Sequence, residues 1–152
     1  MIKFDINREI KYRVWDLNLF IWRDFVLPKQ NGNPVEIGGY DWQNLEEQKD
    51  NLVFQQFIGL FDKNGAPIYE GDILNWESNS MSHRLGECKR TRIVSVKWQE
   101  KSASFIAEAN KHDLLHTPMY WRMDTNDFNG KPFIKEVIGN VFENKELLEN
   151  EI

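Results

Sequence analysis

Two tight turns lie close together within residues 59–74, and they constrain the fold more than any other part of the sequence. Residues 62–65 read Asp-Lys-Asn-Gly, and an Asn-Gly pair suits the positive φ angles that many tight turns require. A second bend is expected at Gly71, directly before Asp72. Apolar residues typical of strands flank both bends. The stretch therefore predicts a strand end, a turn, a short extended bridge, a second turn and a new strand.

The same stretch carries three carboxylates that a hydrolase or a divalent cation could use, namely Asp62, Glu70 and Asp72. Turn chemistry explains them better, because Asp side chains accept backbone N–H bonds near their own position, and no EF-hand-like ligand series follows. We interpret five residues as fold-defining: Asp62, Asn64, Gly65, Gly71 and Asp72. We assign no catalytic residue, no metal ligand and no cofactor.

The rest of the chain has the alternation of apolar and polar residues that is typical of β-strands. Strands are expected at residues 9–15, 19–26, 52–58, 73–76, 91–98, 105–109 and 133–142. Polar residues 78–90 are expected to form a loop, and residues 110–129 an irregular segment interrupted by Met119-Tyr120-Trp121. Asn144 is placed as the N-cap of a short helix over residues 145–148. These elements predict a mainly β fold, either a small barrel or two packed sheets.

Composition limits the classes of function. A chain of 152 residues suits one domain with a real core, and its net charge of −5 disfavours a nonspecific DNA coat. Cys88 is the only cysteine, so no intrachain disulfide is expected and a reducing cytoplasm is the default. The sequence contains neither a secretory signal pattern nor an apolar run of membrane-spanning length.

Positive charge is concentrated in one segment of this acidic chain, at Arg84, Lys89, Arg90, Arg92 and Lys97. Small β-barrels bind nucleic acids with basic rims and stacking aromatic rings, and Trp76 and Trp98 are close in sequence. The alternative is an edge strand whose cations prevent pairing with other edges. Nucleic-acid binding through residues 84–97 is therefore the second interpretation of the function.

Four aromatic residues in loop-like segments are candidates for protein contact: Tyr40, Trp42, Tyr120 and Trp121. They could equally fill the core. His112 and His116 have helical metal-ligand spacing, but Pro118 and the polar neighbours favour a loop. Cys88 lies beside Lys89 but has no partner histidine that the sequence places near it.

Three stretches together resemble the YopX family of phage and prophage proteins. They are residues 8–16, residues 56–65 continuing through 68–73, and residues 137–144 ending in Leu147-Leu148. The resemblance implies one domain over residues 1–152, with an N-terminal β-hairpin portion at about 8–27 and an SH3-like barrel portion at about 52–148. It implies a phage-encoded protein in the cytoplasm of the host bacterium, and it brings no catalytic activity. Residues 28–50, 78–90 and 110–129 fall outside it and are where a specific function is expected.

The leading interpretation is a non-enzymatic accessory protein that binds a partner protein, either a host protein or a second copy of itself. A metal-dependent hydrolase using the acidic turns or His112 and His116 is the weakest of the three interpretations.

Overall fold

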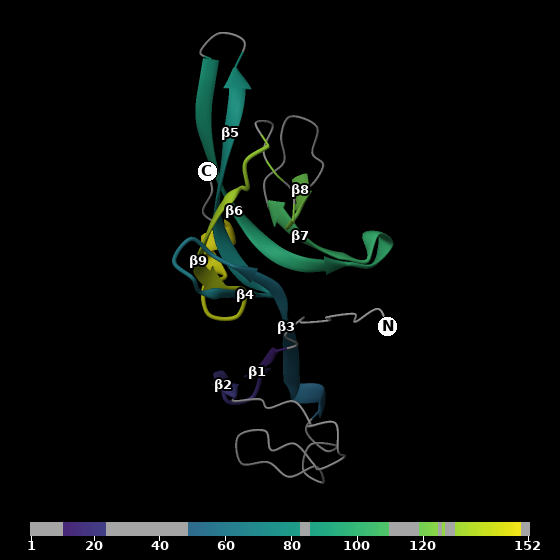
Figure 1. Ribbon diagram of the computed structural model, residues 1–152. Coiled ribbons are helices and arrows are strands. Elements are labelled where there is room, and N and C mark those ends of the chain that lie inside the picture. The colour runs from purple at the N-terminus through teal and green to yellow at the C-terminus, as the bar shows by residue number, and fades with distance from the viewer. Residues whose placement is uncertain are drawn as a thin grey trace, which may run out of the picture. The chain divides into compact units, whose positions relative to one another are not determined.

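The computed structural model describes residues 11–23, 49–82, 86–109, 119–124, 126 and 130–149. The chain forms two compact units, Met1–Gly59 and Leu60–Ile152. Its strands are β1 (Tyr12–Asp16), β2 (Ile21–Arg23), β3 (Leu52–Phe61), β4 (Pro67–Tyr69), β5 (Asp72–Ser82), β6 (Gly86–Gln99), β7 (Ser104–Ala109), β8 (Met119–Arg122) and β9 (Ile134–Asn140). The helical elements are η1 (Lys49–Asn51), η2 (Glu100–Ser102) and α2 (Glu146–Glu149) (Figure 1). The described residues are therefore mainly β, as the sequence predicts.

The first unit is built on strand β1, which pairs antiparallel with β2 on one side and with β3 on the other. Val14 lies opposite Phe54 of β3, and Trp15 lies opposite Trp22 of β2. Val14 and Trp15 are buried. β4 follows β3 as the last strand of this sheet, and the final two residues of β3 already belong to the second unit.

The second unit contains a five-stranded antiparallel sheet with the order β8-β7-β6-β5-β9. Matching positions of neighbouring strands carry apolar residues: Leu74, Val94 and Ala109 lie in one row across β5, β6 and β7. Val96 and Ala107 form the next row. These five side chains are buried, and they form the core of the unit.

The prediction of a loop at residues 78–90 is wrong for most of that range. β5 continues to Ser82 and β6 begins at Gly86, and their register runs unbroken from Ile73 opposite Ser95 to Ser82 opposite Gly86. Backbone pairing between two strands does not need apolar side chains, which is why polarity alone predicted a loop. Met119-Tyr120-Trp121 likewise belongs to a strand, β8, opposite β7.

The first sequence turn closes one edge of this sheet. Residues 62–65 follow β3, and the Lys63 N–H donates to the Lys135 carbonyl of the edge strand β9 at 2.8 Å. The Val137 N–H of the same strand donates to Asp62 Oδ2 at 3.1 Å. Lys63 Nζ also lies 2.8 Å from Glu136 Oε2. The turn therefore occupies backbone groups of β9 that a further strand would otherwise bind.

The second turn ties three parts of the second unit together at Gly71. Its N–H donates to the Val96 carbonyl of β6 at 2.8 Å, and its carbonyl accepts from the Val141 N–H at 2.9 Å. Gly71 is buried and has a φ of 79°. Only glycine adopts this conformation without a steric penalty, and the position is buried, so a side chain is unfavourable here.

Replacing Gly71 with alanine is expected to lower the free energy of unfolding by at least about 2 kcal/mol. Gly65→Ala is the matched control, because Gly65 has a φ of 83° but is exposed, and a Cβ there meets nothing within 4 Å. It should lose only about 1 kcal/mol, the cost of the left-handed conformation. Urea denaturation followed by circular dichroism measures both. Equal losses would show that the burial of Gly71 does not matter.

The end of β9 is shaped by a bulge and an amide turn. Ile73 lies opposite Gly139 and Leu74 lies opposite Val137, so Ile138 is the extra residue. Directly after the bulge, Asn140 Oδ1 accepts the backbone N–H groups of Phe142 at 2.9 Å and Glu143 at 3.0 Å, which forms a turn at the end of β9. The expected N-cap role of Asn144 is wrong, because its side chain accepts from the Asn140 N–H at 3.3 Å and the helix begins two residues later.

Candidate protein-interaction site

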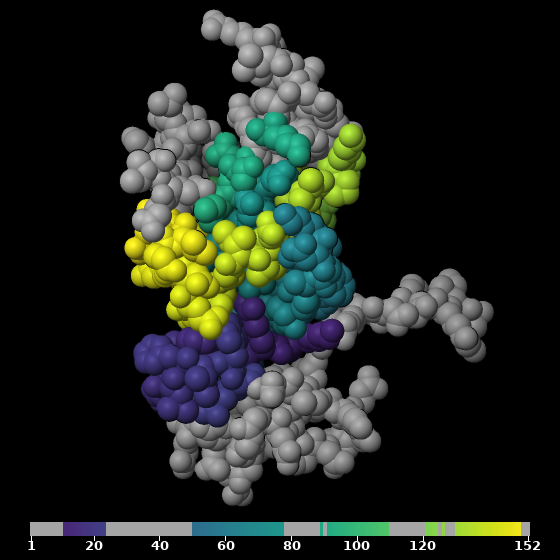
Figure 2. All heavy atoms as spheres, turned by 90° about the vertical axis from the view of Figure 1, so that its left-hand side faces the viewer, coloured from purple at the N-terminus to yellow at the C-terminus, as the bar shows by residue number. Residues whose placement is uncertain are grey.

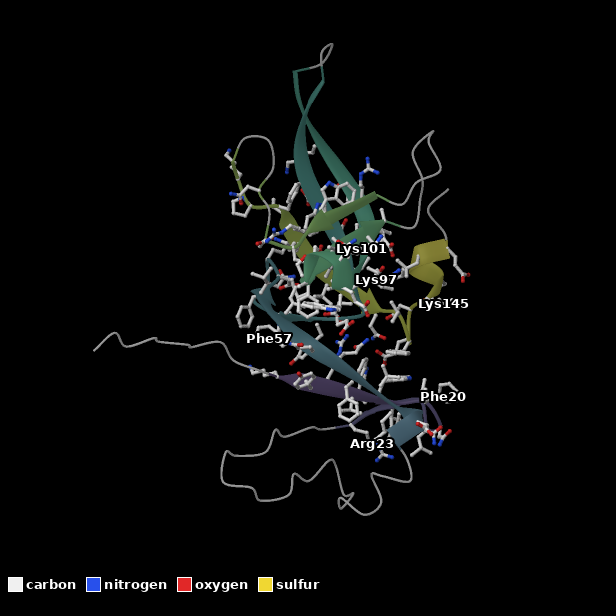
Figure 3. All side chains as sticks on the ribbon, turned by 90° about the vertical axis from the view of Figure 1, so that its right-hand side faces the viewer. Phe20, Arg23, Phe57, Lys97, Lys101 and Lys145 are labelled. Carbon is white, nitrogen blue, oxygen red and sulfur yellow. The ribbon has the colours of Figure 1, made fainter. Side chains whose placement is uncertain are left out.

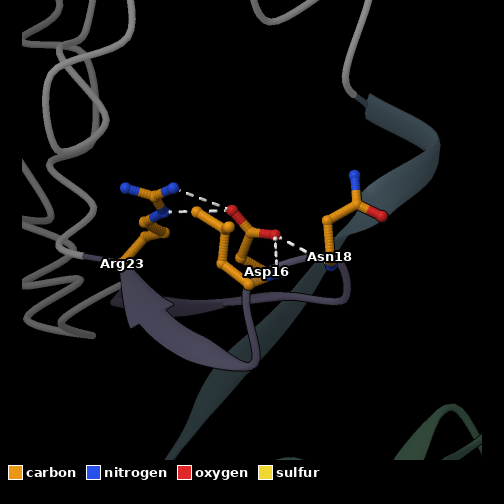
Figure 4. A network of polar contacts seen from close by, with 4 residues as sticks. Asp16, Asn18 and Arg23 are labelled. Carbon is orange, nitrogen blue, oxygen red and sulfur yellow. Dashed lines mark hydrogen bonds and ion pairs between the residues drawn. The ribbon is translucent and has the colours of Figure 1, made fainter.

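The turn between β1 and β2, residues 17–20, is held by the side chain of Asp16 (Figure 4). Asp16 Oδ1 accepts the backbone N–H groups of Asn18 at 2.9 Å and Leu19 at 3.0 Å. The Asp16 carbonyl accepts the N–H of Phe20 at 2.8 Å. The Leu17 N–H donates to the Asn51 carbonyl at 2.8 Å, which anchors the turn to the start of β3. Asp16 therefore fixes the turn through both its side chain and its main chain.

The second carboxylate oxygen of Asp16 binds Arg23 at the end of β2. Arg23 Nε and Nη2 donate to Oδ2 at 3.2 and 2.9 Å. Burial opposes ionisation of Asp16, but the bonds from Arg23 and from the turn amides outweigh it and lower the pKa of this carboxyl below its usual value. The aspartate is thus charged at neutral pH and bound on both oxygens.

The strands beneath this turn are braced by aromatic contacts. The rings of Trp15 and Trp22 meet edge to face with their centroids 4.9 Å apart. The Arg13 guanidinium lies 4.3 Å from the centroid of the Trp22 ring, and its Nε donates to Gln55 Oε1 at 2.7 Å. These contacts join all three strands of the first unit.

This braced turn carries exposed apolar side chains. Phe20 is 73% exposed, Leu19 56% and Ile21 43%. Figure 3 shows Phe20 and Arg23 at the same end of the first unit, and Figure 2 shows the β1–β2 residues, coloured purple to blue, at its surface. Phe20 also has a φ of 54°, a left-handed conformation that is uncommon for a bulky residue and costs free energy. The turn therefore holds an aromatic ring in water in a strained conformation.

The sequence predicts a bend at Asp16 but places a strand from Leu19 onward, whereas β2 begins only at Ile21. Four consecutive apolar residues, Leu19 to Trp22, look like a buried strand. A half-buried strand would alternate apolar with polar residues, and the lack of such alternation here is the one sign in the sequence that part of this run is not a strand. A positive φ at an aromatic residue leaves no trace in the sequence, because such residues rarely adopt it.

The five cations of residues 84–97 do not form one patch among the residues described. Lys89 and Lys97 are on the same face of β6 but eight residues apart, which is about 26 Å along a strand. Arg92 is on the opposite face. Lys89 Nζ lies 3.7 Å from Glu77 Oε2, and Lys97 pairs with Glu108. The Arg92 guanidinium lies over the ring of Trp121, 5.5 Å from its centroid. Arg90 lies on β6 opposite Ser78, and Arg84 is outside the described residues.

The four aromatic candidates are also placed differently from one another. Trp121 is half-buried and stacks on Trp76 with centroids 6.3 Å apart. Tyr120 lies on β8 opposite Glu108. Tyr40 and Trp42 are outside the described residues.

Two of the three acidic residues of the turns, Asp62 and Asp72, accept backbone N–H groups. Asp62 accepts the N–H groups of Asn64 and Ala66 at 2.8 Å each, besides that of Val137. Burial opposes its ionisation, but these three bonds outweigh it and lower the pKa of Asp62. Asp72 Oδ2 accepts the Tyr69 N–H at 2.8 Å. A carboxylate with a lowered pKa that accepts three backbone N–H groups, such as that of Asp62, is a poor general acid or base at neutral pH.

Metal ligands do not gather in the part of the chain that the structure describes. No group of three or more His, Cys, Asp or Glu side chains there could hold an ion. His112 and His116 lie outside that part. No helix among the described residues is long and apolar enough to cross a membrane.

Comparison with known proteins gives a family. The model of the YopX family, described as "YopX protein", matches residues 11–149. The crystal structure of protein EF1440 from Enterococcus faecalis is 26% identical, with a TM-score of 0.51 over 92% of this chain and 98% of that one. No curated protein matches. Because the family model covers most of the sequence, the chain belongs to the YopX family.

Proposed function

We propose that this chain is a non-enzymatic protein-binding module that presents the 17–20 turn to an apolar pocket on a partner protein. The observation that carries the proposal is Phe20, which is 73% exposed and held at a φ of 54°. A strained, exposed aromatic residue is kept where the strain serves a function. We also infer, from the family, that the protein is a phage or prophage accessory protein acting in the bacterial cytoplasm.

The physical properties of the turn suit such a contact. Binding is weakened when loops and side chains must be ordered, and this turn is already ordered by Asp16 and Arg23. Full burial of one aromatic side chain contributes about 1.5–3 kcal/mol, and neighbouring Leu19 and Ile21 add further apolar surface. Central aromatic anchors with an apolar surround are typical of binding hot spots.

The arrangement of charges speaks against the two other interpretations. The described cations of β6 are divided between the two faces of the strand, and two of them are in ion pairs. They therefore do not offer a continuous track for phosphates. In the acidic turns, the carboxylates of Asp62 and Asp72 accept backbone N–H groups. Neither arrangement favours nucleic-acid binding or hydrolysis.

The second unit supports an SH3-like organisation of the fold, which we include in the proposal. Strands β5 to β8 form a meander, and β9 returns to lie beside β5, an order that suits a five-stranded barrel. An experimental structure in which these five strands curve into one barrel would establish it.

Replacing Phe20 with asparagine separates binding from stability. Asparagine tolerates the left-handed conformation, so the free energy of unfolding should rise by about 0.5–1 kcal/mol. Capture of partner proteins from nuclease-treated bacterial lysate should fall at least tenfold. Ile134→Thr, which removes another exposed apolar residue, is the control and should keep full capture. A Phe20→Asn variant that captures the same proteins as the wild type would overturn the proposal.

A further inference from the structure

The edges of the five-stranded sheet are treated in different ways. The outer edge of β9 is covered by the turn at residues 62–65, through the backbone bonds to Lys135 and Val137. β9 also has a bulge at Ile138 in its pairing with β5. The opposite edge strand, β8, is only four residues long. Covering, bulges and shortness are devices by which proteins prevent edge-to-edge pairing.

One edge lacks these devices. β5 runs five residues beyond its last partner on β9, because Glu77 lies opposite Ile134 and the strand ends at Ser82. Among the described residues, 78–82 pair only with β6, so their other side meets no strand (Figure 1). A two-stranded ribbon is marginally stable in water, so pairing along this edge would stabilise it.

The sequence of that edge suits pairing with itself. Residues 78–82 read Ser-Asn-Ser-Met-Ser, without charge and without proline. The neighbouring strand of the ribbon carries Glu87, Lys89, Arg90 and Arg92, charges that protect its own outer edge. Because the chain has a net charge of −5, two copies repel each other, and an uncharged edge lets them approach with the least repulsion.

We propose that residues 78–82 of β5 form an antiparallel edge-to-edge contact with the same residues of a second copy of this chain. Such a contact has two-fold symmetry, with Ser80 opposite Ser80 and Asn79 opposite Met81. No like charges meet, and β6-β5 of each copy join into one four-stranded sheet. The paired length is about 17 Å, which buries less than the roughly 1,200 Å² of a stable interface, so the dimer is weak and depends on concentration.

The test places charges on the symmetry axis. Ser80→Lys and Ser80→Glu each set like charges against each other, and each should raise the dimer dissociation constant at least tenfold in sedimentation velocity. An equimolar mixture of the two variants should recover dimers, because opposite charges then meet. Asn126→Lys and Asn126→Glu, at an exposed position elsewhere, are matched controls and should associate like the wild type.

A second measurement uses the wild type, so it does not depend on how the variants fold. Hydrogen exchange at residues 78–82 should slow as the concentration rises from about 5 to about 500 μM, in the range expected for a small interface. Wild-type protein that stays monomeric at the highest concentration overturns the proposal, as does a dimer that both Ser80 variants leave intact. Phe20→Asn should dimerise normally, so failure here and failure of the proposed partner binding are distinguishable.

Discussion

Replacing Asp62 with alanine is expected to lower the free energy of unfolding by about 3–5 kcal/mol. The side chain is 9% exposed and accepts three backbone N–H groups, from Asn64, Ala66 and Val137. Alanine leaves all three donors without their charged acceptor, and hydrogen bonds to charged groups contribute about 1.5–3 kcal/mol each without being additive. The bond to Val137 spans 75 residues of sequence, so the loss affects the turn and the edge of β9 together.

Asp62→Asn is the informative control for this prediction. An amide oxygen can keep the two bonds at Oδ1, but the amide nitrogen then faces the Val137 N–H, donor against donor. The variant should therefore lose about 1.5–3 kcal/mol, less than alanine does. Urea denaturation at neutral pH gives both values. Losses below about 0.5 kcal/mol in both variants would mean that the turn binds β9 without Asp62.

The same residue predicts how stability depends on pH. The pKa of Asp62 is lowered by folding from an ordinary value of 3.8, so the unfolded state binds the proton more readily. Its contribution is complete above the unfolded pKa and is lost as the pH falls through the lower folded pKa. The stability difference between wild type and Asp62→Asn should accordingly shrink below about pH 4. A difference that stays constant down to pH 2 would show that folding does not lower the pKa of Asp62.

The turn chemistry was predictable because it is local. Asp62 and Gly65 are within four residues of their partners in the turn, and such patterns depend on short-range geometry. The bond from Val137 to Asp62 was not predictable, since it requires β9 to return beside a turn 75 residues earlier. Likewise, sequence alternation predicted a strand at residues 91–98, within β6, but it gave the long β5–β6 ribbon as a loop. Pairing of the two backbones does not depend on side-chain polarity.

In the candidate site, too, the local contacts were predictable from the sequence and the longer-range contacts were not. Asp16 and Asn18 signal a bend in the sequence, but the bond to Arg23 depends on the length of the turn, and β2 begins two residues later than expected. The left-handed Phe20 contradicts local preference, so reasoning from propensity misses it. Positions where local rules fail are those where function or strain is expected, which is why this turn carries the proposed function.

Trp76 provides the other large expected effect, since replacing it with alanine should lower the free energy of unfolding by about 3–5 kcal/mol. Its side chain is 1% exposed. The ring centroid lies 4.8 Å from that of Phe133 and 6.3 Å from that of Trp121, while Lys135 Nζ lies 5.1 Å from it. Alanine would leave a cavity among groups from β8, β9 and the segment before β9, which cannot all move to close it.

Trp76→Phe tests what the indole contributes beyond its volume. The Nε1 atom of Trp76 has no hydrogen-bond partner among the residues that the structure describes, so phenylalanine loses no such bond and removes a buried donor. A phenyl ring keeps the contact with Phe133, and the loss should stay below about 1.5 kcal/mol. Urea denaturation of both variants gives the comparison. If phenylalanine costs as much as alanine, the indole N–H has a hydrogen-bond partner in solution, and that bond contributes to stability beyond the packing of the ring against Phe133.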